Sequence, residues 1–251
     1  MNEAERIKLK LKKQRTNDLM LYICIIMFVA LSICLGIVMF ANRYRPDPSL
    51  CVEYDLSKDL IPDPVQTKIE KDSFMIQKFG VDIKITKLAS YDITGKVEAI
   101  KDYSSNFFSN FLNFEAENMT NYISPRDLTL SWGPIALDEN SNSIKADQNY
   151  LNSERVVWYT YTDSLKKKYG EDYILSHISN NHVVTLNRDL KRELLKIKQA
   201  DIVRIKGYLI EVNCSNGINW GPSSLMRDDH GFHSCEILYA EDIVILNKKY
   251  R

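Results

Sequence analysis

Histidine and cysteine side chains carry most of the reactive chemistry that this sequence offers. Its 251 residues include only four histidines and five cysteines. His230, His233 and Cys235 have a spacing that could hold a transition metal, since imidazole and thiolate are good zinc ligands. A structural zinc site needs four ligands, however, and the sequence contains no C-x-x-C pair. We therefore interpret this segment as a polar loop and expect neither a metal nor another cofactor.

Cys235 also suggests a nucleophilic enzyme. An anchored, β-rich domain with a histidine well before a cysteine resembles the sortase-like transpeptidases, whose chemistry needs a thiolate, a histidine and an arginine close together. The sequence offers Cys235, either His177 or His182, and Arg227 for these roles. The T-L-x-T-C strand end of the sortases is missing. A cysteine- and histidine-dependent envelope enzyme is therefore the alternative function rather than the leading one.

A disulfide between Cys214 and Cys235 is a further expectation. The two cysteines flank the loop between the last two predicted strands, and antiparallel neighbours could bring them within bonding range. An oxidising compartment would permit the bond. Two free thiols are the alternative.

Strand signals dominate the part of the chain that must position these side chains. Alternating β-branched or aromatic residues predict strands at residues 74–76, 81–85, 93–100, 128–130, 156–161, 201–212 and 235–246. Gly95 and Gly207 lie inside two of these strands. A glycine within a strand is typical of a bulge or sharp coil, which small closed barrels require.

Two helices are predicted among the strands. Asn187 can cap a helix over residues 188–199, and a second helix over 105–117 carries phenylalanines at helical spacing. The order after residue 185 is helix, glycine-broken strand, loop and strand. That order is compatible with the second half of an OB-like small barrel. We expect an α+β fold that is mainly β.

The region before the predicted strands contains an apolar run without any charge, residues 19–41. A helix of this length would reach roughly 34 Å, enough to cross a hydrocarbon core of about 30 Å. Basic residues cluster in the preceding arm, residues 1–18. Because positive charge resists translocation, we expect an uncleaved anchor in the bacterial inner membrane with the N-terminus in the cytoplasm.

The prolines mark the next boundary. Four of the seven lie between residues 46 and 64, which predicts an extended stalk over 42–70. One periplasmic or extracellular domain should then occupy 71–251. The whole chain has 33 basic and 33 acidic residues, and the balance after the anchor is slightly acidic. This charge argues against a nucleic-acid partner.

Three motifs together resemble a family of uncharacterised single-pass bacterial membrane proteins. They are the W-G-P run at 132–134, the H-x-x-N-x-H run at 177–182 and the S-S-L-x-R-x-D-x-G-x-x-x-C-E run at 223–236. The resemblance covers most of residues 80–245. It implies the same layout of short cytoplasmic arm, anchor and outer domain, but it implies no activity.

The resemblance also implies a shared polar set, which consists of His177, Asn180, His182, Arg227, Asp229, Cys235 and Glu236. It leaves out His230, His233 and Cys214. The set could be a structural network of charge-assisted hydrogen bonds or a ligand pocket at the mouth of the barrel. We expect a membrane-anchored module that binds or scaffolds another envelope protein.

Overall fold

The computed structural model describes residues 20–36, 53–57, 59–78, 80–103, 116–140, 142–147, 155–226 and 235–248. The chain divides into two compact units, Met1–Arg45 and Pro46–Arg251.

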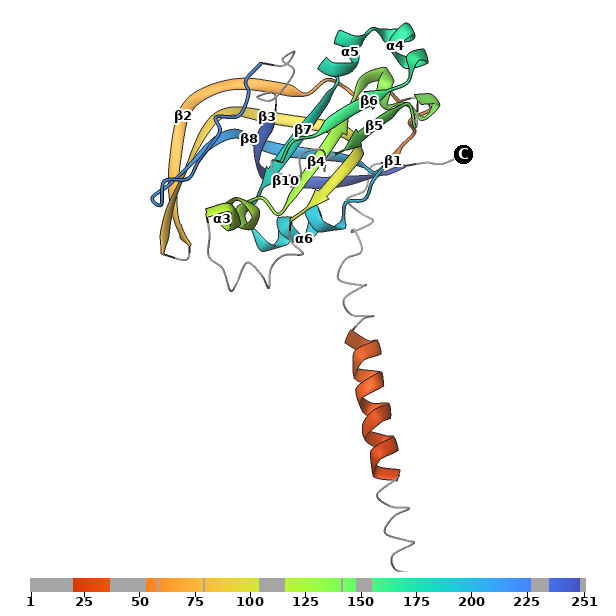
Figure 1. The fold of residues 1–251 in the computed structure, drawn as a ribbon, viewed down its shortest axis with the longest axis vertical. Helices are drawn as coiled ribbons and strands as arrows, with labels where there is room; N and C mark the ends of the chain where they lie inside the picture. Colours follow the sequence, from red (N-terminus) through yellow and green to blue (C-terminus); the bar gives the residue numbers. More distant parts are fainter. Residues whose placement is uncertain are drawn as a thin grey trace, which may run out of the picture. The chain divides into compact units, whose positions relative to one another are not determined.

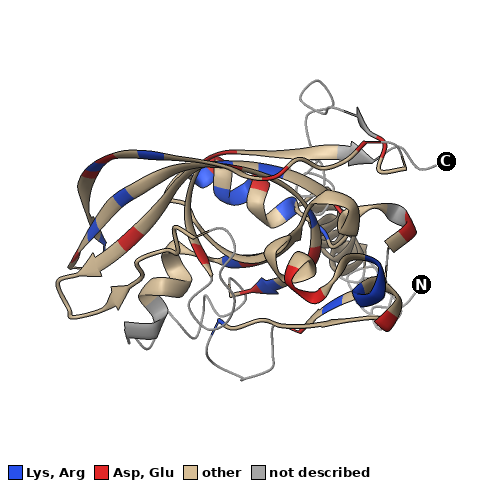
Figure 2. Ribbon diagram, turned by 90° about the horizontal axis from the view of Figure 1, so that it is seen from above, with Lys and Arg blue, Asp and Glu red and all other residues tan. Residues whose placement is uncertain are grey.

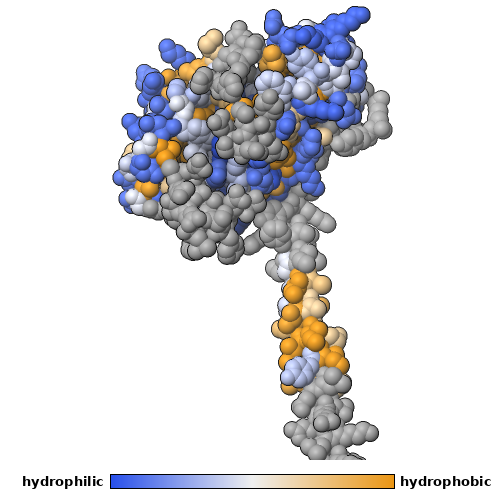
Figure 3. Space-filling model, viewed as in Figure 1, coloured by the Kyte–Doolittle hydropathy of each residue, from blue (hydrophilic) through white to orange (hydrophobic). Residues whose placement is uncertain are grey.

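The first unit contains a helix over residues 20–36, and every side chain of this helix is exposed. The surface of the helix is mostly apolar (Figure 3). Within the part of the chain that the structure describes, no helix combines the length and the apolar character needed to cross a membrane. The basic arm expected over 1–18 lies outside the described residues.

The second unit is mainly β with a few short helices, which confirms the predicted fold class. Its strands are β1 (Glu53–Tyr54), β2 (Val65–Lys78), β3 (Val81–Asp102), β4 (Arg126–Ser131), β5 (Ile144–Asp147), β6 (Trp158–Tyr161), β7 (Ile178–Val184), β8 (Ile202–Cys214), β9 (Asn219–Trp220) and β10 (Glu236–Lys248). Its helices are α3 (Ala116–Ile123), α4 (Asp163–Tyr169), α5 (Glu171–Ser176) and α6 (Arg188–Lys196).

Five of these strands pair in a closed circuit. β3 pairs with β4, β4 with β7, β10 with β8, and β8 with β3, all antiparallel, whereas β7 and β10 are parallel. The interior of the circuit is apolar, with Leu130, Val183, Leu209 and Leu238 fully buried. Burial of such side chains is the main force that holds the strands together.

Gly207 lets β8 approach β10 closely. A Cβ atom at this position would lie 1.9 Å from the backbone oxygen of Tyr239, so only glycine fits there. The register of β10 shifts between Ala240 and Asp242, beside this contact. The irregularity that the sequence predicts at Gly207 is therefore present, although the bulge lies in the partner strand.

A curved extension continues beyond the closed circuit (Figure 1). It consists of β2, the first half of β3 and the second half of β8, which pair along their lengths. Helix α3 packs against it, where Met119 and Ile123 join Ile83, Val212 and Ile237 in a second apolar cluster.

Helix α6 begins as the sequence predicts. The side chain of Asn187 accepts a hydrogen bond from a backbone N–H of the first turn. The helix ends at Lys196, three residues earlier than expected. Arg126 donates hydrogen bonds of 3.0 Å to the carbonyls of Leu194 and Ile197 and so supplies donors to the end of this helix.

The stalk predicted over 42–70 does not hold for its described part. Leu56 and Ile61 are 1% and 0% exposed and belong to the core, and β2 already begins at Val65. Pro62 and Pro64 therefore lie between packed segments, and Pro64 immediately precedes a strand, where proline is tolerated. Most of the helix predicted over 105–117 lies outside the described residues.

Candidate functional site

Strands β4 and β7 place an acid and a histidine opposite each other. Asp127 and His182 are partners in the antiparallel register, so their side chains share the face that points away from the apolar interior. The Nδ1 atom of His182 lies 2.8 Å from Oδ2 of Asp127. The ring nitrogen is not aligned for a hydrogen bond, so the contact is a close ion pair. The two side chains are 5% and 1% exposed, and water is largely excluded from the pair.

A second cation holds the other side of the same carboxylate. Arg155 donates from Nη1 to Oδ1 of Asp127 at 2.7 Å, and the hydroxyl of Tyr103 donates to Oδ2 at 3.1 Å. The guanidinium also lies over the rings of Tyr103 and Trp220, 4.0 and 5.0 Å from their centroids. Asp127 therefore accepts hydrogen bonds from Arg155 and Tyr103 and also lies against His182.

Arg155 connects this carboxylate to the end of α3. Its guanidinium donates to the side chain of Asn121 at 2.7 Å and to the hydroxyl and carbonyl oxygens of Ser124 at 3.1 and 2.8 Å. These contacts use the terminal nitrogens of the guanidinium fully. Arg155 is thus a positioning residue for Asp127.

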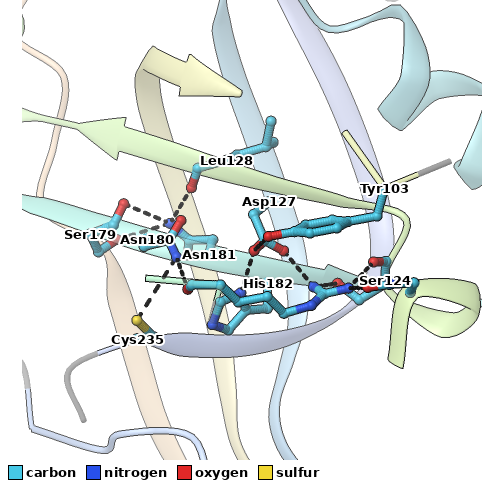
Figure 4. A network of polar contacts seen from close by, with 11 residues as sticks. Tyr103, Ser124, Asp127, Leu128, Ser179, Asn180, Asn181, His182 and Cys235 are labelled. Carbon is cyan, nitrogen blue, oxygen red and sulfur yellow. Dashed lines mark hydrogen bonds and ion pairs between the residues drawn. The ribbon is translucent and has the colours of Figure 1, made fainter. Parts of the chain in front are cut away.

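Cys235 reaches the same face from the neighbouring strand. Glu236 is opposite Asn181 in the parallel register of β10 and β7, which places Cys235 next to Asn180. The Nδ2 atom of Asn180 lies 3.9 Å from the Sγ atom of Cys235 and donates to it (Figure 4). Cys235 is only half-buried. Solvent can therefore reach it, whereas Asp127, Asn180 and His182 are buried.

The electrostatics of the site favour a charged His182. Burial by itself lowers the pKa of the imidazole, but the neighbouring Asp127 carboxylate and Cys235 outweigh it and raise the pKa to about 9. His182 is therefore protonated at neutral pH. Two cations, His182 and Arg155, then surround one anion, Asp127.

This excess of positive charge favours a further anion nearby. Cys235 and Glu236 are the adjacent candidates, and side chains alternate along β10, so Cys235 is the one that shares the face of His182. The phenols stay neutral, because burial and the nearby anionic groups raise the pKa of Tyr103 and of Tyr159. The Cys235 thiol thus lies on the same face as the His182 imidazolium.

The predicted polar set is only partly assembled. Asn180, His182, Cys235 and Glu236 come together at the adjoining parts of β7 and β10. Arg227 and Asp229 lie outside the described residues, as do His230 and His233, the two histidines considered above as metal ligands. Among the residues that the structure describes, no group of three ligand side chains could hold a metal ion.

His177 belongs to a different place. Its ring stacks on Tyr173 with centroids 3.7 Å apart, and Nδ1 lies 2.8 Å from the carbonyl of the same residue. The Nε2 atom lies 3.5 Å from the exposed carboxylate of Asp63. His177 precedes β7, whereas His182 lies near its other end. It therefore does not join the site of Cys235.

Cys214 and Cys235 are both free thiols, so the expected disulfide between them is not formed. Near Cys214, β8 pairs with the short strand β9 rather than with β10: Val212 is opposite Trp220. Cys214 is buried, and burial raises the pKa of its thiol.

Sequence reasoning missed Asp127, Arg155, Tyr103 and Trp220 as parts of this site. The one available signal was an acid at the start of a buried strand, since Asp127 directly precedes the predicted strand at 128–130. Arg155 gives no such signal, because its partners lie about 30 residues earlier in the chain and only the fold joins them.

Comparison of this chain with protein-family models, with curated proteins and with solved structures finds no match.

Proposed function

We propose that this protein is a cysteine-dependent enzyme in which Cys235 is the nucleophile, His182 its proton partner and Asp127 the residue that orients the imidazole. The observation that carries the proposal is the common face of these three side chains on β4, β7 and the start of β10. Cysteine nucleophiles are activated by an adjacent histidine that a third group holds in place. The half-buried thiol is accessible, and the ion pair behind it is shielded.

The resting pair in this proposal is a Cys235 thiolate beside a His182 imidazolium. The sulfur electron pair forms an S–C bond with the substrate, while the leaving group departs with its bonding electrons and takes the imidazolium proton. Neutral His182 then accepts a proton from a water molecule, whose oxygen attacks the same carbon. The electrons of the S–C bond return to sulfur, and the ion pair is restored.

The architecture supports a ligand at this position. We interpret the closed circuit as an OB-like small barrel, because its strand order is β3-β4-β7-β10-β8 and α6 lies between the third and fourth strands in the chain. OB-like barrels bind ligands on the face of their second and third strands and in two flanking loops. Asp127 and His182 lie on those strands. Tyr103 follows β3, and Trp220 and Cys235 lie between β8 and β10.

A non-enzymatic binding or scaffold role is the second candidate, because the ion network also ties α3 to β4. Acidic and basic residues are interspersed over the described strands and helices, as Figure 2 shows, which favours a partner other than nucleic acid. A purely structural network would not need a half-buried thiol beside an imidazolium. The geometry therefore favours the enzyme.

Thiol labelling separates the two functions. The full chain in detergent is treated with iodoacetamide at pH 7, and the rate of labelling is measured for each cysteine by peptide mapping. We expect Cys235 to react faster than an unperturbed thiol, and His182→Gln to slow it by about tenfold or more. The matched control His177→Gln should leave the rate within about twofold. If Cys235 is labelled slowly and neither substitution changes its labelling rate, the enzyme proposal fails and the binding role is favoured instead.

We propose in addition that residues 19–41 anchor the protein in the inner membrane, with the second unit in the periplasm, where it meets another envelope protein. The support is the uncharged run and the exposed apolar side chains along its described helix. A phosphatase fused after Arg251 should be active in intact cells. An inactive fusion would overturn this topology.

A further inference from the structure

The side-chain amide of Asn180 is held directly beside the proposed nucleophile. Its Nδ2 atom donates to the backbone oxygen of Arg155 at 3.2 Å and to the Sγ atom of Cys235 at 3.9 Å. Arg155 is itself fixed by Asp127 and by the end of α3. The amide therefore cannot easily turn away from the sulfur, and one of its N–H bonds points at the place where a substrate would attach (Figure 4).

This position suits a developing oxyanion better than it suits the sulfur. A contact of 3.9 Å is long even for a hydrogen bond to sulfur. An oxygen carried by a carbon atom that is bonded to Sγ can come within the roughly 2.7–3.1 Å at which a donor stabilises an oxyanion. The electrostatics agree, because His182 and Arg155 give this face two cations for one buried carboxylate.

We propose that the substrate is an acyl compound, an ester, thioester or amide, and that Asn180 donates to the oxyanion of its tetrahedral intermediate. This inference rests on the proposed function. The thiolate of Cys235 forms an S–C bond to the carbonyl carbon, and the π electrons of the carbonyl move to oxygen, where Asn180 donates. The intermediate collapses as the C=O bond re-forms and the bond to the leaving group breaks, with a proton from His182. Water, deprotonated by His182, then cleaves the thioester to a carboxylic acid.

The nature of the electrophile gives a direct test. Iodoacetamide alkylates a thiolate with loss of iodide and forms no oxyanion, whereas p-nitrophenyl acetate acylates it through a tetrahedral oxyanion. Both rates at Cys235 are measured on the full chain, with Cys235→Ser as the background. We expect Asn180→Ala to slow acylation by about 100-fold relative to alkylation. Asn180→Asp, which keeps the size of the side chain, should give the same selective loss even if the alanine variant unfolds.

The control is Asn216→Ala, which changes an exposed turn asparagine and should alter neither rate. If the Asn180 variants slow both reactions equally, or neither, Asn180 is not an oxyanion donor, although Cys235 remains a nucleophile. If wild-type Cys235 reacts no faster than an ordinary thiol with either reagent, the proposed function fails and the inference fails with it.

Discussion

Two histidines five residues apart, one before β7 and one within it, have opposite environments. His182 is buried against a buried carboxylate and is held charged, with a pKa of about 9. His177 stacks on Tyr173 and faces Asp63, whose side chain is 79% exposed. The same residue type is thus a controlled cation in one place and an aromatic packing element in the other. The two environments differ in the partner acid, which is buried beside His182 and exposed beside His177.

The strand keeps these environments apart. Five residues of extended chain span about 16 Å, so neither histidine can serve the other's partners. Substitutions at one position should therefore leave the other unaffected, and each prediction below contrasts the two.

The largest contrast should come from the two acids. Asp127→Asn leaves two buried cations without their counter-ion, so we expect a loss of about 3–5 kcal/mol in the free energy of unfolding. Asp63→Asn removes an exposed partner and should cost less than about 0.5 kcal/mol. Denaturant titration of the full chain, followed by tryptophan fluorescence, measures both. If both variants lose the same free energy of unfolding, the buried network around Asp127 does not stabilise the site.

The pH dependence of stability should identify His182. Its pKa is raised from an unfolded value near 6.5 to about 9, so its contribution is fully present below pH 6.5 and is lost as pH rises through 9. We expect the free energy of unfolding to fall by roughly 3 kcal/mol across this window. His182→Gln should remove the decline, whereas His177→Gln should retain it. A flat wild-type profile would contradict the assigned charge.

A smaller effect is expected from the phenol that shares Asp127. Tyr103→Phe removes the hydroxyl that donates to Oδ2 of Asp127 but keeps the ring under Arg155. A hydrogen bond to a charged group contributes about 1.5–3 kcal/mol, and we expect a loss at the lower end. The same denaturant titration measures it. No loss would mean that the two cations satisfy Asp127 alone.

The last prediction concerns the other histidine. Gly133 has φ +66°, and a Cβ there would come 3.0 Å from the His177 ring. Gly133→Ala should cost about 1–2 kcal/mol through backbone strain and displacement of that ring. The labelling rate of Cys235 should stay unchanged. A slower Cys235 would show that the two environments are coupled after all.

Local patterns were sufficient for some of the elements. Alternation predicted both ends of β8 and of β10 to within two residues. Gly207 marked the irregular pairing between these strands, and Asn187 marked the start of α6. Such features depend on neighbours in the chain. Part of the site followed from the resemblance, which implied Asn180, His182 and Cys235, although β7, the strand that carries Asn180 and His182, was not among the predicted strands.

The rest of the site depends on partners that are distant in sequence. The register between β4 and β7 brings Asp127 to His182, and nothing in either segment reveals that register. Arg155 directly precedes the strand predicted at 156–161, but nothing in that segment reveals the partners of its side chain. The stalk prediction failed for a related reason: proline composition reports local stiffness, not whether Leu56 and Ile61 find a core to pack against.

The parallel pairing of β10 with β7 also sets the order in which the protein can mature. β10 closes the circuit between β7 and β8, and it is the last of the described strands to be synthesised. Until β10 has paired with β7, the Cys235 thiol therefore has no His182 beside it. If Cys235 is the nucleophile, its reactivity is therefore acquired only after β10 has closed the circuit, and the nascent chain is protected from it.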